Sequence, residues 1–270
     1  MSGPTTLVLD IGGTSIKAAA LDERERPMAE PVRVPMSYPV EPGALLDLLA
    51  SVASALPSTD RVSVGFPGVV RSARVLTAPA FVAIAGLGST VSPSLVRTWT
   101  GFDLGGAVAE RLARPTLLAN DADLLGLGAA EGVGLELVVT LGAGFGTALL
   151  RDGDLCPHME FAHDLFRDDE TYNEQLGDAA RQRVGPVEWT RRVQLALGAL
   201  HRLLSYDRVW LLGGNVRWLT GDPSDLGHEA TVVESSAGLV GGVRLWRCHG
   251  TVIDLTSDET RTSNAVSPAD

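Results

Sequence analysis

The stretch LVLDIGGTSIKAAALD, residues 7–22, has the pattern of an apolar strand, a turn of small residues and a second apolar strand. A second stretch, LVVTLGAGFGTALLRD, residues 137–152, aligns with it without a gap and brings Gly12 onto Gly142. The copies are about 130 residues apart, far more than a solenoid period. We therefore predict two lobes that each carry such a β-hairpin. The alternative, that unrelated hairpins share turn glycines, stays open at this point.

The turns of both hairpins suit an anionic ligand. Glycine adopts positive φ and lets the backbone approach a ligand closely, so successive turn N–H groups can surround anionic oxygens. Lys17, the only lysine of the chain, follows the first turn, although a general preference for arginine explains its rarity equally well. Two facing hairpins of this type would hold a chain of phosphates.

Two common nucleotide-binding motifs do not fit. The segment GAGFG, residues 142–146, is followed by TALLRDG, which predicts a strand and a turn, whereas the dinucleotide fingerprint leads into a helix. The chain also contains no G-x-x-x-x-G-K-[ST] sequence. These observations argue against an NAD-binding Rossmann domain and against a P-loop enzyme.

Composition excludes several classes of protein. The 270 residues are 45% hydrophobic, enough for the core of one large domain or two lobes, and no apolar run approaches the roughly 18 residues of a membrane span. The formal net charge of −11 argues against nucleic-acid binding, because phosphate backbones favour basic surfaces. Cys156 and Cys248 lack the spacing of a zinc site or a disulfide framework. We expect a cytoplasmic protein with no membrane or nucleic-acid partner.

Apolar periodicity predicts two α/β lobes. We place the first lobe at residues 1–119, the second at 120–250 and a disordered polar tail at 251–270. The Gly- and Ser-rich segment 82–98 is expected to be a loop. Helices are expected at residues 45–56, 104–113, 174–183, 187–204 and 237–246, and further strands at residues 61–70, 115–120 and 208–214.

Together these motifs resemble those of a known family. In chain order, DIGGTSIK, FPGVV, NDAD, LGAGFGTAL, MEFAH and GGN resemble the phosphate, structural, catalytic, sugar and nucleotide motifs of the ROK sugar kinases, over about residues 6–246. The absence of that family's cysteine-rich zinc motif agrees with its polyphosphate-glucokinase-like branch. The resemblance implies a two-lobed, actin-like (ribonuclease H-like) α/β ATPase fold of the actin and hexokinase superfamily, with duplicated lobes and a cleft between them.

The resemblance also implies roles for single residues. Asp121 would be the general base that takes the proton of the sugar hydroxyl, and Asp10 a direct or indirect partner of Mg²⁺, the implied cofactor. The sugar would be bound by Asn120, Glu160, His163 and Glu174. The phosphates would be bound by Gly12, Gly13, Thr14, Lys17, Gly142, Gly144, Gly146 and Thr147, and the nucleotide by Gly213, Gly214 and Asn215.

The segment NDAD, residues 120–123, supports the role of Asp121 on physical grounds. A strand-to-helix junction would put its carboxylate in the positive field of a helix N-terminus, which favours the ionised form that accepts a proton. Simpler alternatives stay open. Asn120 or Asp121 could only cap the helix, Asp10 could only start a turn, and Asp123 could only be a first-turn partner of the helix dipole.

Three positions depart from the family pattern. Ala162 replaces the glycine of E-x-G-H, Ala80 replaces an asparagine on the sugar side, and Leu212 replaces the first glycine of G-G-G-N. We still predict a homodimeric hexose kinase that transfers phosphate from polyphosphate or ATP to the 6-hydroxyl of glucose or a close analogue. A non-catalytic, ROK-type sugar sensor without a DNA-binding domain is the alternative.

A long polyphosphate would need a basic track to the site. The expected helices carry four candidate arginines, and the sequence leaves open which way they face. They are Arg181, Arg183, Arg191 and Arg192.

Overall fold

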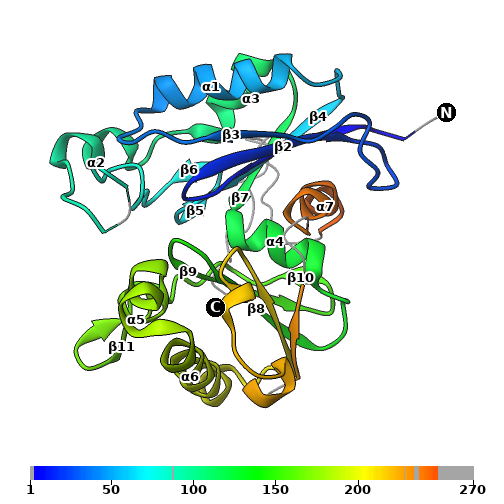
Figure 1. Ribbon diagram of the computed structural model, residues 1–270. Coiled ribbons are helices and arrows are strands. Elements are labelled where there is room, and N and C mark those ends of the chain that lie inside the picture. The colour runs from blue at the N-terminus through cyan, green and yellow to red at the C-terminus, as the bar shows by residue number, and fades with distance from the viewer. Residues whose placement is uncertain (1–2, 87, 228, 234–236, 249–270) are drawn as a thin grey trace, which may run out of the picture.

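The computed structural model describes residues 3–86, 88–227, 229–233 and 237–248, so the expected tail at 251–270 lies outside the described residues. Two five-stranded mixed sheets form the centre of the protein (Figure 1). The first has the order β3-β2-β1-β4-β7, and its strands are β1 (Thr6–Ile11), β2 (Ser15–Leu21), β3 (Val32–Pro35), β4 (Arg61–Phe66) and β7 (Thr116–Asn120). The second has the order β10-β9-β8-β13-β14, and its strands are β8 (Leu135–Leu141), β9 (Phe145–Arg151), β10 (Asp154–Leu155), β13 (Arg208–Leu212) and β14 (Ala230–Val232).

Helices cover both sheets. The α-helices are α1 (Pro42–Ser54), α2 (Pro93–Trp99), α3 (Leu104–Leu112), α4 (Asp121–Ala129), α5 (Tyr172–Leu176), α6 (Asp178–Leu204) and α7 (Ala237–Arg244). Short 3-10 helices are η1 (Val216–Trp218), η2 (Pro223–Leu226) and η3 (Leu245–Arg247), and small hairpins pair β5 (Val70–Arg71) with β6 (Arg74–Val75) and β11 (Leu165–Arg167) with β12 (Glu170–Thr171). Within the described residues, every helix is too short or too polar to cross a lipid bilayer.

The sheets repeat one another, as the duplicated hairpin predicts. In each sheet the hairpin strands β1-β2 or β8-β9 are antiparallel, and the next strand, β4 or β13, runs parallel to the first. The gapless alignment is wrong by one residue in the second strand. Ile11 pairs with Ile16 but Leu141 pairs with Phe145, so the second turn is one residue shorter and Ala18 corresponds to Thr147.

The central strands are buried on both faces, which explains their continuous apolar runs. In β1, Leu7 and Leu9 belong to a core with α1 and α3, whereas Val8 belongs to a core with α4, α7 and the second sheet. In β8, Leu137 packs with α6, and Val138 returns to the core shared with α4 and α7. The layers are therefore α1 and α3, first sheet, α4 and α7, second sheet, and α6 (Figure 1).

Two expected segments differ from the structure. Residues 93–99 of the expected loop form α2, whose apolar side is only Leu95 and Trp99, too short a pattern to stand out in a Gly- and Ser-rich context. The expected helix 174–183 is interrupted at Gly177, which separates α5 from α6. A second irregularity at Gly185, with φ of 78°, agrees with the expected start of a new helix near residue 187.

Helices α4 and α7 cross at very close range. Helix α4 contacts strands of both sheets, and α7 contacts strands of the first sheet. A Cβ atom on Gly241 of α7 would lie 1.7 Å from the carbonyl oxygen of Leu124 in α4, and one on Gly128 would lie 1.8 Å from the carbonyl oxygen of Ala237. Only glycine fits at these crossing points, because the obstacle is backbone that a rotamer change cannot move.

We predict that Gly241→Ala lowers the free energy of unfolding by about 3 kcal/mol, because the added methyl group forces the two helices apart. Gly43→Ala is the matched control, since a Cβ there meets no atom within 4 Å in the first turn of α1. Urea denaturation followed by circular dichroism measures both variants. Equal midpoints for the two variants would contradict this account of the crossing.

Candidate active site

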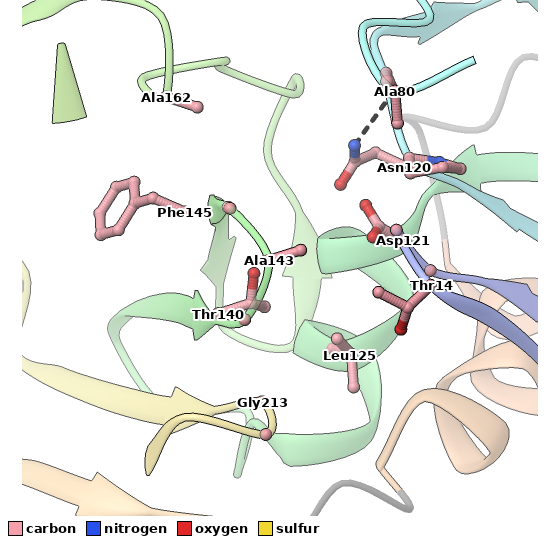
Figure 2. Close-up of a pocket in the computed structure, with 18 of the residues that line it drawn as sticks. Thr14, Ala80, Asn120, Asp121, Leu125, Thr140, Ala143, Phe145, Ala162 and Gly213 are labelled. Atoms are coloured by element: carbon pink, nitrogen blue, oxygen red, sulfur yellow. Dashed lines mark hydrogen bonds between the residues drawn. The ribbon is translucent and has the colours of Figure 1, made fainter. Parts of the chain in front are cut away.

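A cavity of about 390 Å³ lies where the two hairpin turns, the β7-to-α4 junction and the loop after β13 meet. Its lining contains every residue that the sequence predicts for the site except Glu174. Figure 2 shows Asn120 and Asp121 at the start of α4, with Ala143 and Phe145 of the second hairpin across the cavity. Residues far apart in the sequence therefore form one site.

The turns of the two hairpins face one another. A Cβ atom on Gly13 would lie 3.5 Å from that of Ala143. The Tyr38 hydroxyl donates to the Gly13 carbonyl at 2.6 Å, and Asn215 Nδ2 donates to the Gly142 carbonyl at 2.9 Å, so each turn is anchored from outside. This geometry places small residues and backbone on both sides of the space where phosphates are predicted.

The loop after β13 closes the same end of the cavity. Gly213 has φ of 100°, and a Cβ there would lie 2.3 Å from the Leu141 carbonyl oxygen, so this position requires glycine. Gly214 and Asn215 also line the cavity. The predicted nucleotide residues thus lie directly against the second hairpin turn.

Asn120 ends β7 and caps α4. Its Oδ1 accepts from the backbone N–H groups of Ala122 at 2.7 Å and Asp123 at 3.4 Å, while its Nδ2 donates to the Gly68 carbonyl at 3.0 Å. The capping alternative for Asn120 is therefore present in the structure, and these bonds occupy both ends of the amide. The cap leaves Asp121, the first residue of the helix, on the cavity wall.

The pKa of Asp121 is shifted upward, whereas we expected the helix N-terminus to favour the ionised form of this carboxyl group. Burial, the negative charge of Asp10 and that of Glu160 raise the pKa of Asp121 to about 8, although the backbone N–H of Ala122 and the positive charge of His158 lower it. A helix N-terminus contributes only about 0.3–1 kcal/mol in favour of the ionised form, which is too little to offset burial beside another acid. Without ligands, the carboxyl group of Asp121 is largely protonated at pH 7.

Asp10 provides the second acid. It is the last residue but one of β1, is 6% exposed, and burial raises its pKa to about 6 despite the opposing positive charge of Lys17. Its negative charge in turn raises the pKa of Asp121, and two neighbouring acids suit a bound cation. Mg²⁺ needs only one or two carboxylates in addition to phosphate and water, and no group of three or more ligating side chains occurs among the residues that the structure describes. Asp10 fits that donor set.

The cavity lining also carries two of the predicted sugar residues. Glu160 and His163 both line it, and Glu160 Oε1 accepts from the Ala162 backbone N–H at 3.2 Å. The Thr147 hydroxyl, predicted to bind phosphate, donates to the Met159 carbonyl at 3.0 Å and fixes the segment that carries Glu160.

Glu174 lies elsewhere. Its carboxylate accepts from the Thr171 backbone N–H and from the Thr171 hydroxyl, both at 2.8 Å, and completes a capping box at the start of α5. Its neighbour Asn173 lines the cavity instead, and Asn173 Oδ1 accepts from the Phe145 backbone N–H at 2.9 Å.

The sequence reasoning missed three charged residues of the cavity lining, namely Arg33, His158 and Arg217. Arg33 Nε donates to the Ser15 hydroxyl at 3.0 Å beside the first turn. His158 precedes Glu160 by two positions, a spacing that puts alternate side chains on one side of an extended segment and could have indicated it. Arg217 follows Asn215 by two residues, and no sequence pattern marked Arg33.

The four arginines considered for a polyphosphate track do not line the cavity. Arg181 pairs with Asp178 and Arg183 with Glu170, while Arg191 and Arg192 both pair with Glu188. The basic residues at the cavity are instead Lys17, Arg33, Arg217 and the predicted His163, together with His158.

We predict that Asp121→Asn stabilises the ligand-free protein by about 2 kcal/mol at pH 8.5, and by much less at pH 5. The folded-state pKa of Asp121 is about 8, against an ordinary value of 3.8, so ionising this carboxyl weakens the folded state as pH rises from about 4 to about 8. The expected gain in the free energy of unfolding is smaller than the full pKa difference implies, because the Asp121 side chain is partly exposed.

Thermal denaturation across this pH range measures the effect. Asp169→Asn is the matched control, since Asp169 is exposed in a turn with φ of 58° that asparagine also adopts. A difference between Asp121→Asn and wild type that did not grow with pH would contradict the burial of this acid.

Comparisons with known proteins show which proteins this chain resembles. A polyphosphate glucokinase of Mycobacterium leprae is 26% identical over 250 residues, which are 86% of this chain and 72% of that protein. Among solved structures, an inorganic polyphosphate/ATP-glucomannokinase from Arthrobacter sp. strain KM is 28% identical with a TM-score of 0.74, covering 89% of this chain and 97% of that one.

The fold extends to more distant structures. A ROK family glucokinase from Streptomyces griseus, solved with glucose and AMPPNP, is 19% identical with a TM-score of 0.67, covering 89% of this chain and 98% of that one. These likenesses confirm the two-lobed actin-like fold. The ROK family model matches residues 6–160, more than half of the chain. The protein therefore belongs to the ROK family.

Proposed function

We propose that this sugar kinase transfers a phosphoryl group from polyphosphate or ATP to the 6-hydroxyl of glucose or a close analogue. The observation that carries the proposal is the position of Asp121, on the wall of a cavity that is also lined by two glycine-rich turns and by Glu160 and His163. Relatives named polyphosphate glucokinase support both the sugar and the donor.

The reaction needs a base and a fixed geometry. The sugar 6-hydroxyl loses its proton to the Asp121 carboxylate, its oxygen forms a bond to the terminal phosphorus, and the bond from that phosphorus to the bridging oxygen breaks. The leaving group is ADP or a polyphosphate shortened by one unit. Glu160 and His163 hold the sugar ring so that the hydroxyl points at the phosphorus, and lobes 1–119 and 120–250 exclude water by closing.

Asp10 would hold Mg²⁺, which supplies positive charge to the phosphates of the donor. That charge also removes one cause of the raised pKa of Asp121, since the negative charge of Asp10 is among the groups that raise it. Bound Mg²⁺ would thus favour the ionised, proton-accepting form of Asp121. A homodimer in the cytoplasm is part of the same proposal.

We expect Asp121→Asn to lower kcat by about 10²–10⁴-fold, the usual contribution of a general base, while the sugar dissociation constant stays within about threefold. Asparagine keeps the size of the side chain but cannot take the proton. Steady-state kinetics with glucose and either donor, together with calorimetry of glucose binding, provide both values.

Asp169→Asn again serves as the control for the charge change and should have wild-type kcat. Near-normal turnover by Asp121→Asn would contradict its role as the base. Glucose binding by the wild type without turnover of any hexose with either donor would instead favour a sugar sensor.

We also expect polyphosphate to be used at least as well as ATP, and Arg217→Gln to raise the KM of either donor about 10-fold while the sugar KM stays unchanged. Arg217 is exposed at the donor end of the cavity, where a guanidinium group can pair with a phosphate oxygen. Initial rates at matched phosphoryl concentration compare the donors.

Arg191→Gln is the control, because Arg191 is exposed and paired with Glu188 away from the cavity lining. Turnover with ATP alone would defeat the assignment of polyphosphate. Equal effects of the two arginine variants would defeat the role of Arg217.

A further inference from the structure

His158 lies between two carboxylates beside the proposed sugar end of the cavity. Its Nδ1 is 3.1 Å from Asp123 Oδ1, a hydrogen-bond distance, and its Nε2 is 3.8 Å from Glu160 Oε2, the distance of an ion pair. The side chains of His158 and Asp123 are each 8% exposed, and that of Glu160 is 22% exposed. Asp123, His158 and Glu160 therefore form a row of side chains that runs from helix α4 to a carboxylate at the cavity surface.

The charge on this row follows from its neighbours. Burial favours the neutral ring, but the hydrogen bond and charge of Asp123 and the charge of Glu160 raise the pKa of His158 to about 10. Burial likewise raises the pKa of Glu160, yet His158 lowers it further, so that the net shift is downward. Burial raises the pKa of Asp123, although the hydrogen bond and charge of His158 oppose that rise. A charged imidazolium ring between the two carboxyl groups satisfies this arrangement.

The Nε2 atom of His158 has no hydrogen-bond partner in the described part of the chain, and it is shielded from solvent. A buried N–H without an acceptor is unfavourable, so it favours any movement that brings Glu160 Oε2 closer. Because Nε2 is shielded, a ligand in the cavity does not contact this atom directly, although His158 belongs to the lining. The other oxygen of Glu160 is already held by the Ala162 backbone N–H at 3.2 Å.

We propose that His158 is a positioning residue, which links Glu160 to Asp123 of α4 and so holds the Glu160 carboxylate in the orientation that binds the sugar. This inference rests on the proposed function, in which Glu160 contacts the sugar. Asp123 does not line the cavity, so its effect on a ligand must pass through His158. The same helix starts at Asp121, so the link also ties the sugar-binding acid to the element that carries the base.

Two substitutions of His158 separate positioning from simple packing. A glutamine amide nitrogen takes the place of Nε2 and can donate to Glu160, whereas an asparagine amide nitrogen takes the place of Nδ1 and reaches only Asp123. If His158 positions Glu160, His158→Asn weakens glucose binding about 10-fold and raises the sugar KM equally, and His158→Gln keeps both within about threefold. The donor KM stays close to wild type in both variants, and any fall in kcat is the same in both, because both lose the positive charge that lowers the pKa of Asp121.

If His158 only fills space beside α4, the order of the two sugar affinities is reversed, because asparagine keeps the bond to Asp123 and glutamine loses it. That reversal, or wild-type affinity in both variants, would overturn the inference. Asp123→Asn gives an independent test with a smaller expected loss of sugar affinity, about threefold, because it weakens the same contact that His158→Gln removes. It decides the matter if neither His158 variant folds, and wild-type affinity in Asp123→Asn would then overturn the inference.

Calorimetry of glucose binding without donor is the main measurement, and steady-state kinetics follow. His201→Gln is the matched control, since His201 packs edge-to-face on Tyr206 and does not line the cavity. Wild-type protein that binds glucose without turnover would defeat the kinase function but leave the calorimetric test of His158 intact. Wild-type protein that binds no hexose would overturn both.

Discussion

The side chain of Asn120 is the contact on which the site depends. It joins the end of β7, the first turn of α4 and the loop after β4, because its oxygen caps the helix while its nitrogen donates to the Gly68 carbonyl. A helix that begins one residue earlier or later would turn Asp121 away by about 100°, given 3.6 residues per turn. The cap therefore sets the direction of the acid at the same time as it satisfies buried backbone groups.

The position that the cap imposes is unfavourable in the absence of ligands. Asp121 and Asp10 approach the same cavity from α4 and β1, and each is buried enough to have a raised pKa. The surrounding fold tolerates this because α4 is held by close contact with α7, where Gly128 and Gly241 leave no space between the helices. Rigid packing on one face of α4 thus supports an electrostatically strained carboxyl on its first turn.

Much of this arrangement could be predicted from the sequence, because local patterns carried it. The two hairpins show continuous apolar runs and small turn residues at matching positions, and the order of the motifs identified the fold. The register of the second strand could not be predicted, since a turn shorter by one residue leaves the apolar pattern almost unchanged. The sequence also did not show whether Glu174 binds the sugar or caps α5. Its partner in the structure is Thr171, a neighbour in the sequence.

The direction in which long side chains point could also not be predicted from the sequence. Arg181 and Arg183 sit on a helix near the cavity, yet the structure pairs them with Asp178 and Glu170. His158 was missed for the opposite reason. Its importance depends on Asp123, which is 35 residues away and reaches it only after α4 has packed against the second sheet. Such pairs are set by tertiary contacts rather than by local periodicity.

Both basic and acidic side chains line the cavity, and their charges bear on catalysis. Lys17, Arg33 and Arg217 line it together with Asp10, Asp121 and Glu160. Under the proposed function, a neutral hexose suits Asp121 and Glu160, because its hydroxyl groups donate to carboxylates, whereas an anionic sugar would be repelled by them. Under the proposed function, the sugar product carries its new phosphate on the oxygen beside Asp121. Once the donor has left, this phosphate is repelled by Asp121 and Glu160, which favours release of the product.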